Sequence, residues 1–380
     1  MARKLKSDKL LFTAMLLLVC TSVVMVYSAS AVMAGELYHN QYLFLFKQLT
    51  FALLGLLLVQ LIMRVDYRKY REPPVIWTCL GVVALGLVAV LFGEARNGAQ
   101  RWLNLGGLGI QPSELAKICV IMFVAALLER RMDRIDEPGR TLLPIAAVLG
   151  AVIGLILLEP DLGTAVSIVM IASVMIFAAG INYKYVAGLA LTALPALFML
   201  IWTSEYRWRR LQAYLDGPWR DPLGDGFQPI QSMIAVATGG VFGRGLMGGV
   251  QKLFYLPEPH NDFIFAVISE ELGMIGATVV LGCFCVITWR GLRTSLRAPD
   301  RFGAFLALGL TTMVAFQAFF NMSVVIGVLP TKGIPLPFVS YGGSSLLVNL
   351  VGMGMLLNVS QHASGSHQVV TTALPITADA

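Results

Sequence analysis

Residues 141–180 read TLLPIAAVLGAVIGLILLEPDLGTAVSIVMIASVMIFAAG, and this stretch decides the class of fold. Its only charged residues, Glu159 and Asp161, stand at a proline-containing turn between two apolar runs, at 141–158 and 163–181. Each run is close to the roughly 20 apolar residues that a helix needs to cross a membrane. Backbone in contact with lipid must satisfy its own hydrogen bonds, so we predict two membrane-spanning helices here.

Similar runs recur along the whole chain of 380 residues, of which 57% are hydrophobic and only 13% are charged. A soluble domain carries roughly 25% charged residues, so the composition predicts an all-α polytopic membrane protein. The first run is longer than the roughly 7–15 apolar residues of a cleaved signal peptide, so we expect it to be retained. We predict about ten spanning helices, at 10–33, 43–63, 75–93, 113–129, 141–158, 163–181, 185–203, 263–289, 302–329 and 342–360.

The distribution of Lys and Arg between these runs predicts the orientation. With the N-terminus inside, the predicted cytoplasmic segments hold 17 Lys and Arg, against 3 in the short outer segments. Positive residues concentrate on the cytoplasmic side, so both termini are predicted to be cytoplasmic. The long segment 204–262, between the seventh and eighth helices, is then extracytoplasmic, and its aromatic content favours an ordered structure against the membrane face. We assign residues 1–360 to one transmembrane domain and residues 361–380, rich in Ser, Thr and Ala, to a disordered cytoplasmic tail.

The segment 252–266 carries the strongest local signal for chemistry. Glu258, His260 and Asp262 cluster in it beside two prolines, at the predicted outer mouth of the eighth helix. A carboxylate in this position could be a helix cap. Asp262 could equally accept a proton from a hydroxyl group as a general base.

Other ionisable residues lie at the edges of the predicted spans or within them, where they are costly and tend to mark function. Glu114 and Lys117 are three residues apart, so they could form an ion pair on one face of a helix. Arg101 and Lys117 could instead bind a pyrophosphate. We interpret the carboxylates at 159–161 as part of a plain turn.

Two further segments have more than one interpretation. Glu270 and Glu271 could be polar contacts between helices, or could line a proton or polar pathway. The segment 329–345 contains glycines and prolines that break a helix at the predicted outer face. Irregular backbone is tolerated at that depth where it lines a cavity.

Several functions are excluded by motifs that the sequence lacks. It has no Walker A loop, so the chain drives no pump with ATP. Ser113 and Lys117 are one residue too far apart for the Ser-x-x-Lys pair of penicillin-binding proteins, so we expect no peptide cross-linking. The five cysteines lie in apolar runs, in no metal or disulfide pattern. The net charge of +6 follows from orientation, and no nucleic-acid partner is expected.

Together these segments resemble the SEDS family of shape, elongation, division and sporulation proteins, from the first helix to about Ser360. Pro330-Thr-Lys-Gly333 and Phe254-Tyr-Leu-Pro-Glu258 are more similar to the division branch of the family than to its elongation branch. Asn261 stands where many members have Thr. The shared motifs are Arg101-Trp-Leu-Asn-Leu-Gly with Gln111-Pro-Ser-Glu-Leu-Ala-Lys117, Glu159-Pro-Asp-Leu-Gly-Thr164, Phe254-Tyr-Leu-Pro-Glu-Pro-His-Asn-Asp-Phe-Ile-Phe-Ala266 with Glu270-Glu-Leu-Gly273, and Pro335-Leu-Pro-Phe-Val-Ser-Tyr-Gly-Gly-Ser-Ser345.

The resemblance implies an inverting peptidoglycan glycosyltransferase that polymerises lipid II, with Asp262 at the position of the family's catalytic aspartate. Lipid II would attack a growing strand held on undecaprenyl pyrophosphate, and cations would stabilise the departing pyrophosphate. A divalent cation could share that role, although no ligand cluster in the sequence demands one. The residues predicted to bind substrate are Arg101, Glu114, Lys117, Arg207, Arg210, His260, Lys332 and Ser340.

The implied partners are a class B penicillin-binding protein, which would cross-link the strands, and other membrane proteins of the division complex at the septum. Other functions stay open. An elongation-type polymerase would carry out the same reaction elsewhere in the cell. A non-catalytic scaffold would tolerate replacement of Asp262. A lipid II flippase would need a polar path through the bundle, for which the sequence offers Lys47, Glu114, Lys117, Glu270 and Glu271.

Overall fold

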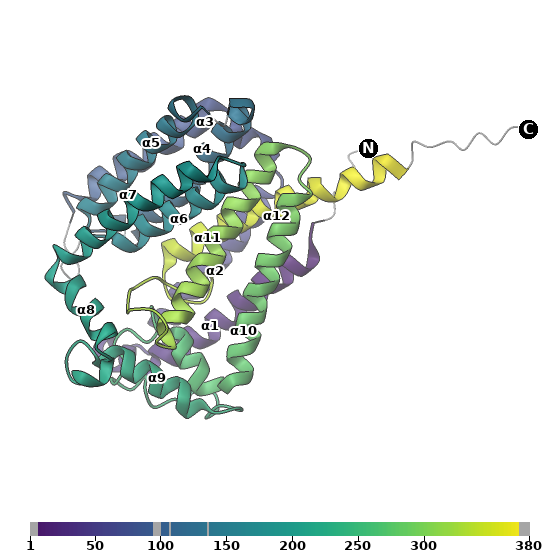
Figure 1. The fold of residues 1–380 in the computed structure, drawn as a ribbon. Coiled ribbons are helices and arrows are strands. Elements are labelled where there is room, and N and C mark those ends of the chain that lie inside the picture. The colour runs from purple at the N-terminus through teal and green to yellow at the C-terminus, as the bar shows by residue number, and fades with distance from the viewer. Residues whose placement is uncertain (1–6, 94–99, 106–107, 135–136, 372–380) are drawn as a thin grey trace, which may run out of the picture.

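The computed structural model describes residues 7–93, 100–105, 108–134 and 137–371 as a bundle of long helices (Figure 1). A long helix lies at each of the predicted spans. These helices are α1 (Lys9–Tyr38), α2 (Leu43–Ile62), α3 (Pro73–Val90), α4 (Pro112–Arg131), α5 (Pro138–Leu158), α6 (Leu162–Ala178), α7 (Tyr183–Trp202), α10 (Ile264–Leu296), α11 (Arg301–Val325) and α12 (Gly343–Thr371).

Within the described residues, 8 of these helices are long and apolar enough to cross a membrane. The other two are α6, which has 17 residues, and α4, which carries charged residues near both ends. The chain is thus a polytopic, mainly helical membrane protein, as predicted. That α4 and α6 also cross the membrane stays a prediction.

The long segment 204–262 is structured, as predicted. It contains α8 (Glu205–Leu215), the 3-10 helix η3 (Pro218–Arg220) and α9 (Phe227–Gly239). Two further 3-10 helices, η1 (Tyr67–Arg71) and η2 (Met132–Arg134), follow α2 and α4.

Two features differ from the expected pattern of helices. Strands β1 (Leu103–Leu105) and β2 (Leu108–Ile110) form an antiparallel hairpin before α4, in which Leu103 pairs with Ile110. Helix α12 continues past the predicted domain boundary at residue 360 and ends at Thr371. The rest of the predicted tail, 372–380, lies outside the described residues.

The helices begin where the local sequence predicts a start. Proline occupies the first turn of α3, α4 and α5, where its missing N–H would have had no partner inside the helix. Asp8, Asp161 and Asp300 cap α1, α6 and α11 by accepting hydrogen bonds from backbone N–H groups of the first turn. Polar residues between the apolar runs therefore define the helix boundaries.

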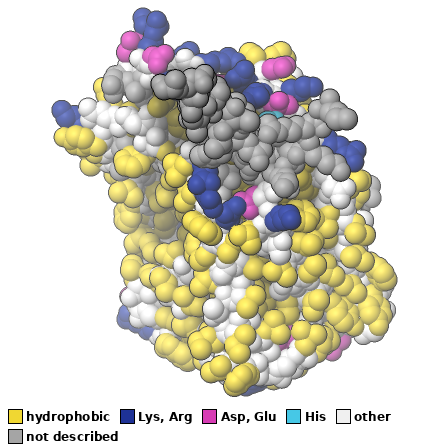
Figure 2. All heavy atoms as spheres, turned by 90° about the vertical axis from the view of Figure 1, so that its right-hand side faces the viewer, with side chains coloured by type: hydrophobic (Ala, Val, Ile, Leu, Met, Phe, Trp, Pro, Cys, Tyr) yellow, Lys and Arg dark blue, Asp and Glu magenta, His cyan; other side chains and the backbone are white. Residues whose placement is uncertain are grey.

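Helix α4 lies in the middle of the bundle, in contact with α3, α5, α6, α11 and α12, and most of its side chains are buried. Helix α7 lies at the edge against α6 and α8, and none of its described side chains is buried. Large hydrophobic side chains cover much of the outside of the bundle, as the face drawn in Figure 2 shows. A surface of this kind suits lipid, where helices associate by packing and polar contacts.

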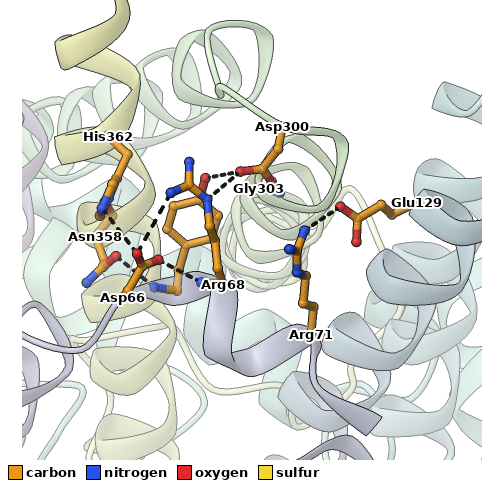
Figure 3. A network of polar contacts seen from close by, with 9 residues as sticks. Asp66, Arg68, Arg71, Glu129, Asp300, Gly303, Asn358 and His362 are labelled. Atoms are coloured by element: carbon orange, nitrogen blue, oxygen red, sulfur yellow. Dashed lines mark hydrogen bonds and ion pairs between the residues drawn. The ribbon is translucent and has the colours of Figure 1, made fainter.

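The chain alternates between two ends of the bundle. One end, called here the tail end, holds the connections 63–72, 132–134, 179–182 and 297–300. Figure 3 shows contacts that join them: Arg68 donates to Asp300 at 3.1 Å, and Arg71 pairs with Glu129 at 3.0 Å. Asp8 pairs with Arg290 at the same end. The Lys- and Arg-rich segments predicted to be cytoplasmic are therefore gathered at one end.

The opposite end, called here the loop end, holds 39–42, 100–105, 108–111, 159–161, 203–263 and 326–342. Tyr341 donates its backbone N–H to the carbonyl of His260 at 2.9 Å, so segments far apart in the sequence meet there. All the segments predicted to be extracytoplasmic are at this end.

Helix α10 is interrupted at Gly273, whose φ of 67° and ψ of −165° are open almost only to glycine. The loop that follows α9 packs into this break. Met274 donates its backbone N–H to the carbonyl of Gly240 at 2.9 Å, and Arg244 donates to the carbonyl of Glu270 at 3.0 Å. The interruption thus anchors the loop that leads to Asp262.

Two fully buried carboxylates at the break hold the same loop. Glu270 accepts a hydrogen bond from the backbone N–H of Val250 at 2.8 Å, and Glu271 accepts one from Met247 at 3.0 Å. Glu271 also pairs with the buried Nζ of Lys252 at 2.6 Å. Of the two interpretations of Glu270 and Glu271, the contacts match polar links between elements.

Candidate active site

Asp262 lies at the loop end, between a turn-rich segment and the first residue of α10. Its side chain is half-buried. Its backbone carbonyl accepts a hydrogen bond from Nδ2 of Asn321 on α11 at 2.7 Å. The same Nδ2 also donates to the carbonyl of Ile334 at 2.9 Å, so one buried amide ties Asp262 to the segment that follows α11.

Gly333 packs directly against the carboxylate of Asp262. A Cβ atom added to Gly333 would lie 2.6 Å from Oδ2 of Asp262, closer than real Cβ contacts come. Glycine is therefore needed at this position because the two segments approach each other so closely.

Ser340 and His260 contact residues of the protein next to Asp262. Oγ of Ser340 donates to the carbonyl of Asn261 at 2.7 Å and accepts from the N–H of Leu336 at 2.8 Å. The buried His260 ring lies between Phe44 and Tyr341, with ring centroids 4.9 and 5.4 Å away. Both residues were predicted to bind substrate, and the contacts found here are to the protein.

The charge of His260 follows from its surroundings. Burial lowers the pKa of its ring to about 4, so the ring is neutral at pH 7. Glu258 lies 3.8 Å away, but a neutral ring cannot form an ion pair with it. Glu258 is exposed and accepts a hydrogen bond from Nδ2 of Asn261 at 2.6 Å, so the three clustered residues of the sequence motif have different surroundings.

Cationic side chains from three separate segments gather near Asp262: the charges of Arg101 and Arg210 act on Asp262, and those of Arg101, Arg207 and Arg210 act on Lys332. Arg101 comes from the segment before β1, Arg207 and Arg210 from α8, and Lys332 from the segment after α11. All four side chains are half-buried.

The arginines are oriented mainly by carbonyl oxygens. Arg101 donates to the carbonyls of Glu159 at 3.1 Å and of Pro160 at 2.8 Å. Arg210 donates to the side-chain oxygen of Gln228 on α9 at 3.1 Å, and its guanidinium lies 4.5 Å above the ring of Tyr206. None of these contacts neutralises a guanidinium, so the charges stay available to an anionic ligand.

Opposing effects act on the pKa of the Asp262 carboxyl. Burial raises its pKa to about 6, and the nearby Glu258 adds to the rise. The charges of Arg210 and Arg101 oppose it. Asp262 is consequently ionised at neutral pH but can take up a proton readily, as a general base must.

Burial acts on the pKa of Lys332 in the opposite direction. Burial lowers the pKa of its ammonium to about 8, against the charge of Asp161. The neighbouring Arg207, Arg101 and Arg210 lower it further. A site in which cations repel one another in this way is suited to a polyanion such as a pyrophosphate.

The turn between α5 and α6 contributes more than the plain turn that was expected. Asp161 accepts hydrogen bonds from the backbone N–H of Thr164 at 3.2 Å and from its hydroxyl at 2.6 Å, which caps α6. It also accepts a hydrogen bond from Gln111 at 3.3 Å and faces the charge of Lys332. Asp161 and Lys332 were named from separate motifs that are far apart in the chain. Nothing in the sequence indicated that the fold brings them close together.

Glu114 and Lys117 form an ion pair inside the first turns of α4. The Nζ of Lys117 lies 2.8 Å from both carboxylate oxygens of Glu114, and both side chains are buried. The predicted ion pair is present. No described contact joins it to Asp262, and a role in substrate binding stays a prediction.

Asn321 is a residue of the site that the sequence analysis did not predict. A buried amide near the end of the apolar helix α11 was a usable signal, because a buried polar group needs partners. Among the described residues, no three His, Cys, Asp or Glu side chains form a cluster that could hold a metal.

Comparison with known proteins places this geometry in a family. A family model described as "Cell cycle protein", covering FtsW, RodA and SpoVE, matches residues 8–365. A probable peptidoglycan glycosyltransferase FtsW of Geobacter sp. (strain M18) is 44% identical over 94% of this chain and 98% of its own length. Stage V sporulation protein E of Bacillus subtilis (strain 168) is 43% identical over 95% of this chain and 99% of its own length.

Solved structures of similar proteins indicate the same family. A chain from a peptidoglycan synthase complex, in a study of how polymerization and crosslinking are coordinated, superposes with a TM-score of 0.77 at 32% identity, covering 95% of this chain and 99% of its own. The rod shape determining protein RodA of Thermus thermophilus superposes with a TM-score of 0.70 at 28% identity, covering 94% of this chain and 97% of its own. The chain therefore belongs to the FtsW/RodA/SpoVE family of cell cycle proteins, the SEDS family that its motifs predicted.

Proposed function

We propose that this chain is a peptidoglycan glycosyltransferase that polymerises lipid II into glycan strands, with Asp262 as the general base. The observation that carries the proposal is a half-buried carboxylate with a pKa of about 6, on which the charges of Arg101 and Arg210 act from two different segments. The glycosyltransferase names of the relatives support the same activity.

In the proposed reaction, the 4-hydroxyl of the GlcNAc of lipid II attacks the anomeric carbon of the growing strand. A new glycosidic C–O bond forms with inversion, and the bond from that carbon to undecaprenyl pyrophosphate breaks. The hydroxyl proton passes to Asp262, a step that contributes roughly 10²–10⁴-fold in comparable enzymes. The released pyrophosphate carries away the electron pair of the broken bond.

Cationic side chains stabilise the charge that develops on the pyrophosphate. The charges of Arg101 and Arg210 act on Asp262, and Lys332 lies near both of these arginines and Arg207. Such groups are most effective where they are held in place before the reaction and partly shielded from water. The Glu114–Lys117 pair lies deeper in the bundle, and we propose no step for it.

The loop end is proposed to face the outside of the plasma membrane, because the Lys- and Arg-rich segments gather at the tail end. A transpeptidase of the class B penicillin-binding protein type is the proposed partner, since the chain itself lacks cross-linking motifs. A relative solved within a peptidoglycan synthase complex supports a partner of this kind. The division septum is the proposed site of action, in line with the FtsW names of several relatives.

The test is glycan synthesis from lipid II by the purified chain with its transpeptidase partner, comparing wild type with Asp262→Asn. This change keeps the shape of the side chain but removes the base, so polymer should fall by at least 10²-fold. Asp216→Asn is the matched control, because Asp216 lies in the same long segment with an exposed side chain paired to Arg220. It should polymerise like wild type.

Equal polymer from wild type and Asp262→Asn would remove Asp262 from the mechanism. No polymer from wild type, together with movement of lipid II between leaflets in vesicles, would assign the chain to the flippases. The structure gives a flippase little support, since Glu270 and Glu271 are engaged by the loop after α9 and Glu114 is paired with Lys117.

A further inference from the structure

A pocket of about 180 Å³ opens at the loop end beside the Asp262 site, and of its lining residues the proposed reaction uses only Arg210. Its walls come from α8, η3, α9 and the segment 327–331. In Figure 1, α8 and α9 lie toward one end of the bundle, next to the ends of α1 and α10.

Aromatic and charged side chains line the pocket together. Tyr214 is fixed by a hydrogen bond from its hydroxyl to the carbonyl of Val328 at 2.6 Å. Trp219 also lines the pocket and is 65% exposed, although an indole of this size gains from burial. Arg210 and Asp225 add charges of opposite sign to the rim.

The charge balance and the size of the pocket limit its ligand. A phosphate would meet the carboxylate of Asp225 as well as the guanidinium of Arg210, so a neutral group with several hydroxyls fits better. Pockets for drug-sized molecules run to roughly 300–1,000 Å³, and this one is smaller. A single pyranose ring has the required size, with a C–H face to lie on an aromatic ring and hydroxyls to meet the polar rim.

The pocket and the Asp262 site are built by neighbouring residues of one segment. Arg210 lines it and also donates to the carbonyl of Thr331 at 3.4 Å, and Thr331 lines it too. Two residues further on, Gly333 lies against the carboxylate of Asp262. Two residues of chain span at most about 7 Å, so a sugar in the pocket lies within a short reach of the reacting carbon.

We propose that this pocket is a subsite for a sugar ring of the growing glycan strand, upstream of the ring that reacts at Asp262. The inference rests on the proposed function. Lipid II offers only two sugars, both close to its pyrophosphate and to the membrane. The growing strand alone extends further, and a bound upstream ring would keep it attached between additions.

The first test compares the length of glycan strands made from lipid II by wild type, Trp219→Ala and Leu223→Ala. Leu223 is 90% exposed in the same segment and does not line the pocket, so it is the control. Losing the aromatic face should weaken retention of the strand about two- to tenfold. Strands from Trp219→Ala should shorten accordingly, while the rate of the first coupling of two lipid II molecules changes less than twofold.

Unchanged strand length in Trp219→Ala would overturn the subsite. A second measurement does not depend on polymerase activity: a soluble tetramer of N-acetylglucosamine is titrated while tryptophan fluorescence is followed. Wild type should respond, and Trp219→Phe should lose most of the response. A response only to a free stem pentapeptide would also overturn the proposal. Failure of wild type to make polymer, with the tetramer still bound at Trp219, would count against the proposed function but not against the sugar site.

Discussion

Asp262 and Lys332 titrate on opposite sides of neutral pH, and the proposed mechanism needs the first deprotonated and the second protonated. The pKa of Asp262 is about 6 and that of Lys332 is about 8. The rate of polymerisation should therefore fall as the pH drops below about 6 and fall again as it rises above about 8. The measurement is kcat/KM for lipid II from pH 5 to pH 9, which reports the groups of the free enzyme.

Lys332→Arg provides the control for this profile. Arginine keeps its charge at every pH of the experiment, so the alkaline limb should disappear while the acid limb stays near pH 6. An alkaline limb that persists in Lys332→Arg would assign it to another group.

Glu159 predicts a pH dependence of stability rather than of activity. Its side chain is fully buried, and neither carboxylate oxygen has a hydrogen-bond partner among the described residues. Burial, followed by the charge of Asp161, raises its pKa from 4.5 to about 8, against Arg101. An unfolded chain gives up this proton near pH 4.5, so stability is lost as the pH rises from there to about 8, by at most about 1.4 kcal/mol per pH unit.

Glu159→Gln removes the ionisable group but keeps its shape. The variant should unfold at a higher temperature than wild type at pH 9 and at a closely similar temperature at pH 5, measured by thermal unfolding in detergent. The same difference at both pH values would show that the effect does not come from ionisation.

For single residues, the sequence could predict which side chains belong to the site but not which side chains they contact. Asp262, Arg101, Arg210 and Lys332 were predicted from separate motifs, and the fold brings their charges together. The role of Asn321 could not be predicted, because it depends on two carbonyls from different segments meeting at one amide.

The break in α10 is the element on which the loop leading to Asp262 depends. Gly273→Ala would place a Cβ atom 2.5 Å from the carbonyl oxygen of Val241 and 2.7 Å from the carbonyl carbon of Phe242. The backbone strain alone costs about 1–3 kcal/mol, so the variant should unfold at a clearly lower temperature and lose polymerase activity.

Gly282→Ala is the matched control in the same helix. A Cβ atom there meets nothing within 4 Å, and the backbone is helical. It should be neutral or stabilising by about 0.5–1 kcal/mol. Equal thermal stability of the two variants would show that the break does not hold the loop in place.

Variants of the Glu114–Lys117 ion pair in α4 can distinguish a structural role of the pair from a role in binding substrate. Glu114→Gln leaves the buried ammonium of Lys117 without its carboxylate, which should cost about 3–5 kcal/mol of stability. Adding Lys117→Met should restore much of that stability, since a neutral pair buries no charge. Thermal unfolding of the single and double variants measures this.

Activity of the double variant then separates the two roles. A stable but inactive double variant would support the predicted role of Glu114 and Lys117 in binding substrate. A stable and active one would make the pair purely structural. A double variant no more stable than Glu114→Gln alone would contradict the ion-pair argument.

Among the elements, the long helices could be predicted because their apolar runs have the length of a membrane span. The hairpin β1–β2 was missed although Gly106-Gly107 between two short apolar stretches is a hairpin signal. The short helices α8 and α9 were not predicted individually, although the apolar side chains of each recur on one face of the helix. The break at Gly273 depends on the backbone of the loop after α9, which no local pattern shows.

For the whole molecule, the count of Lys and Arg predicted which segments lie on the same side. The structure gathers those segments at one end, and charged side chains collect at the top of Figure 2 above a mainly hydrophobic face. Figure 3 shows two contacts that join elements at that end. Arg68 of η1 donates to Asp300, and His362 of α12 lies 3.9 Å from Asp66, the residue before η1. Sequence and structure thus agree on the two ends, and which end faces the cytoplasm is a separate question.

That question has a direct test, on which the proposed function depends, because lipid II is polymerised only on the outside. In a variant whose five cysteines are replaced by alanine, single cysteines are introduced at Leu223, 90% exposed at the loop end, and at Arg140, 64% exposed at the tail end. A maleimide that cannot cross membranes should label Leu223→Cys in intact spheroplasts, and Arg140→Cys only after they are permeabilised. The reverse pattern would place Asp262 in the cytoplasm, where no growing strand exists, and would exclude the polymerase whatever the geometry of its site.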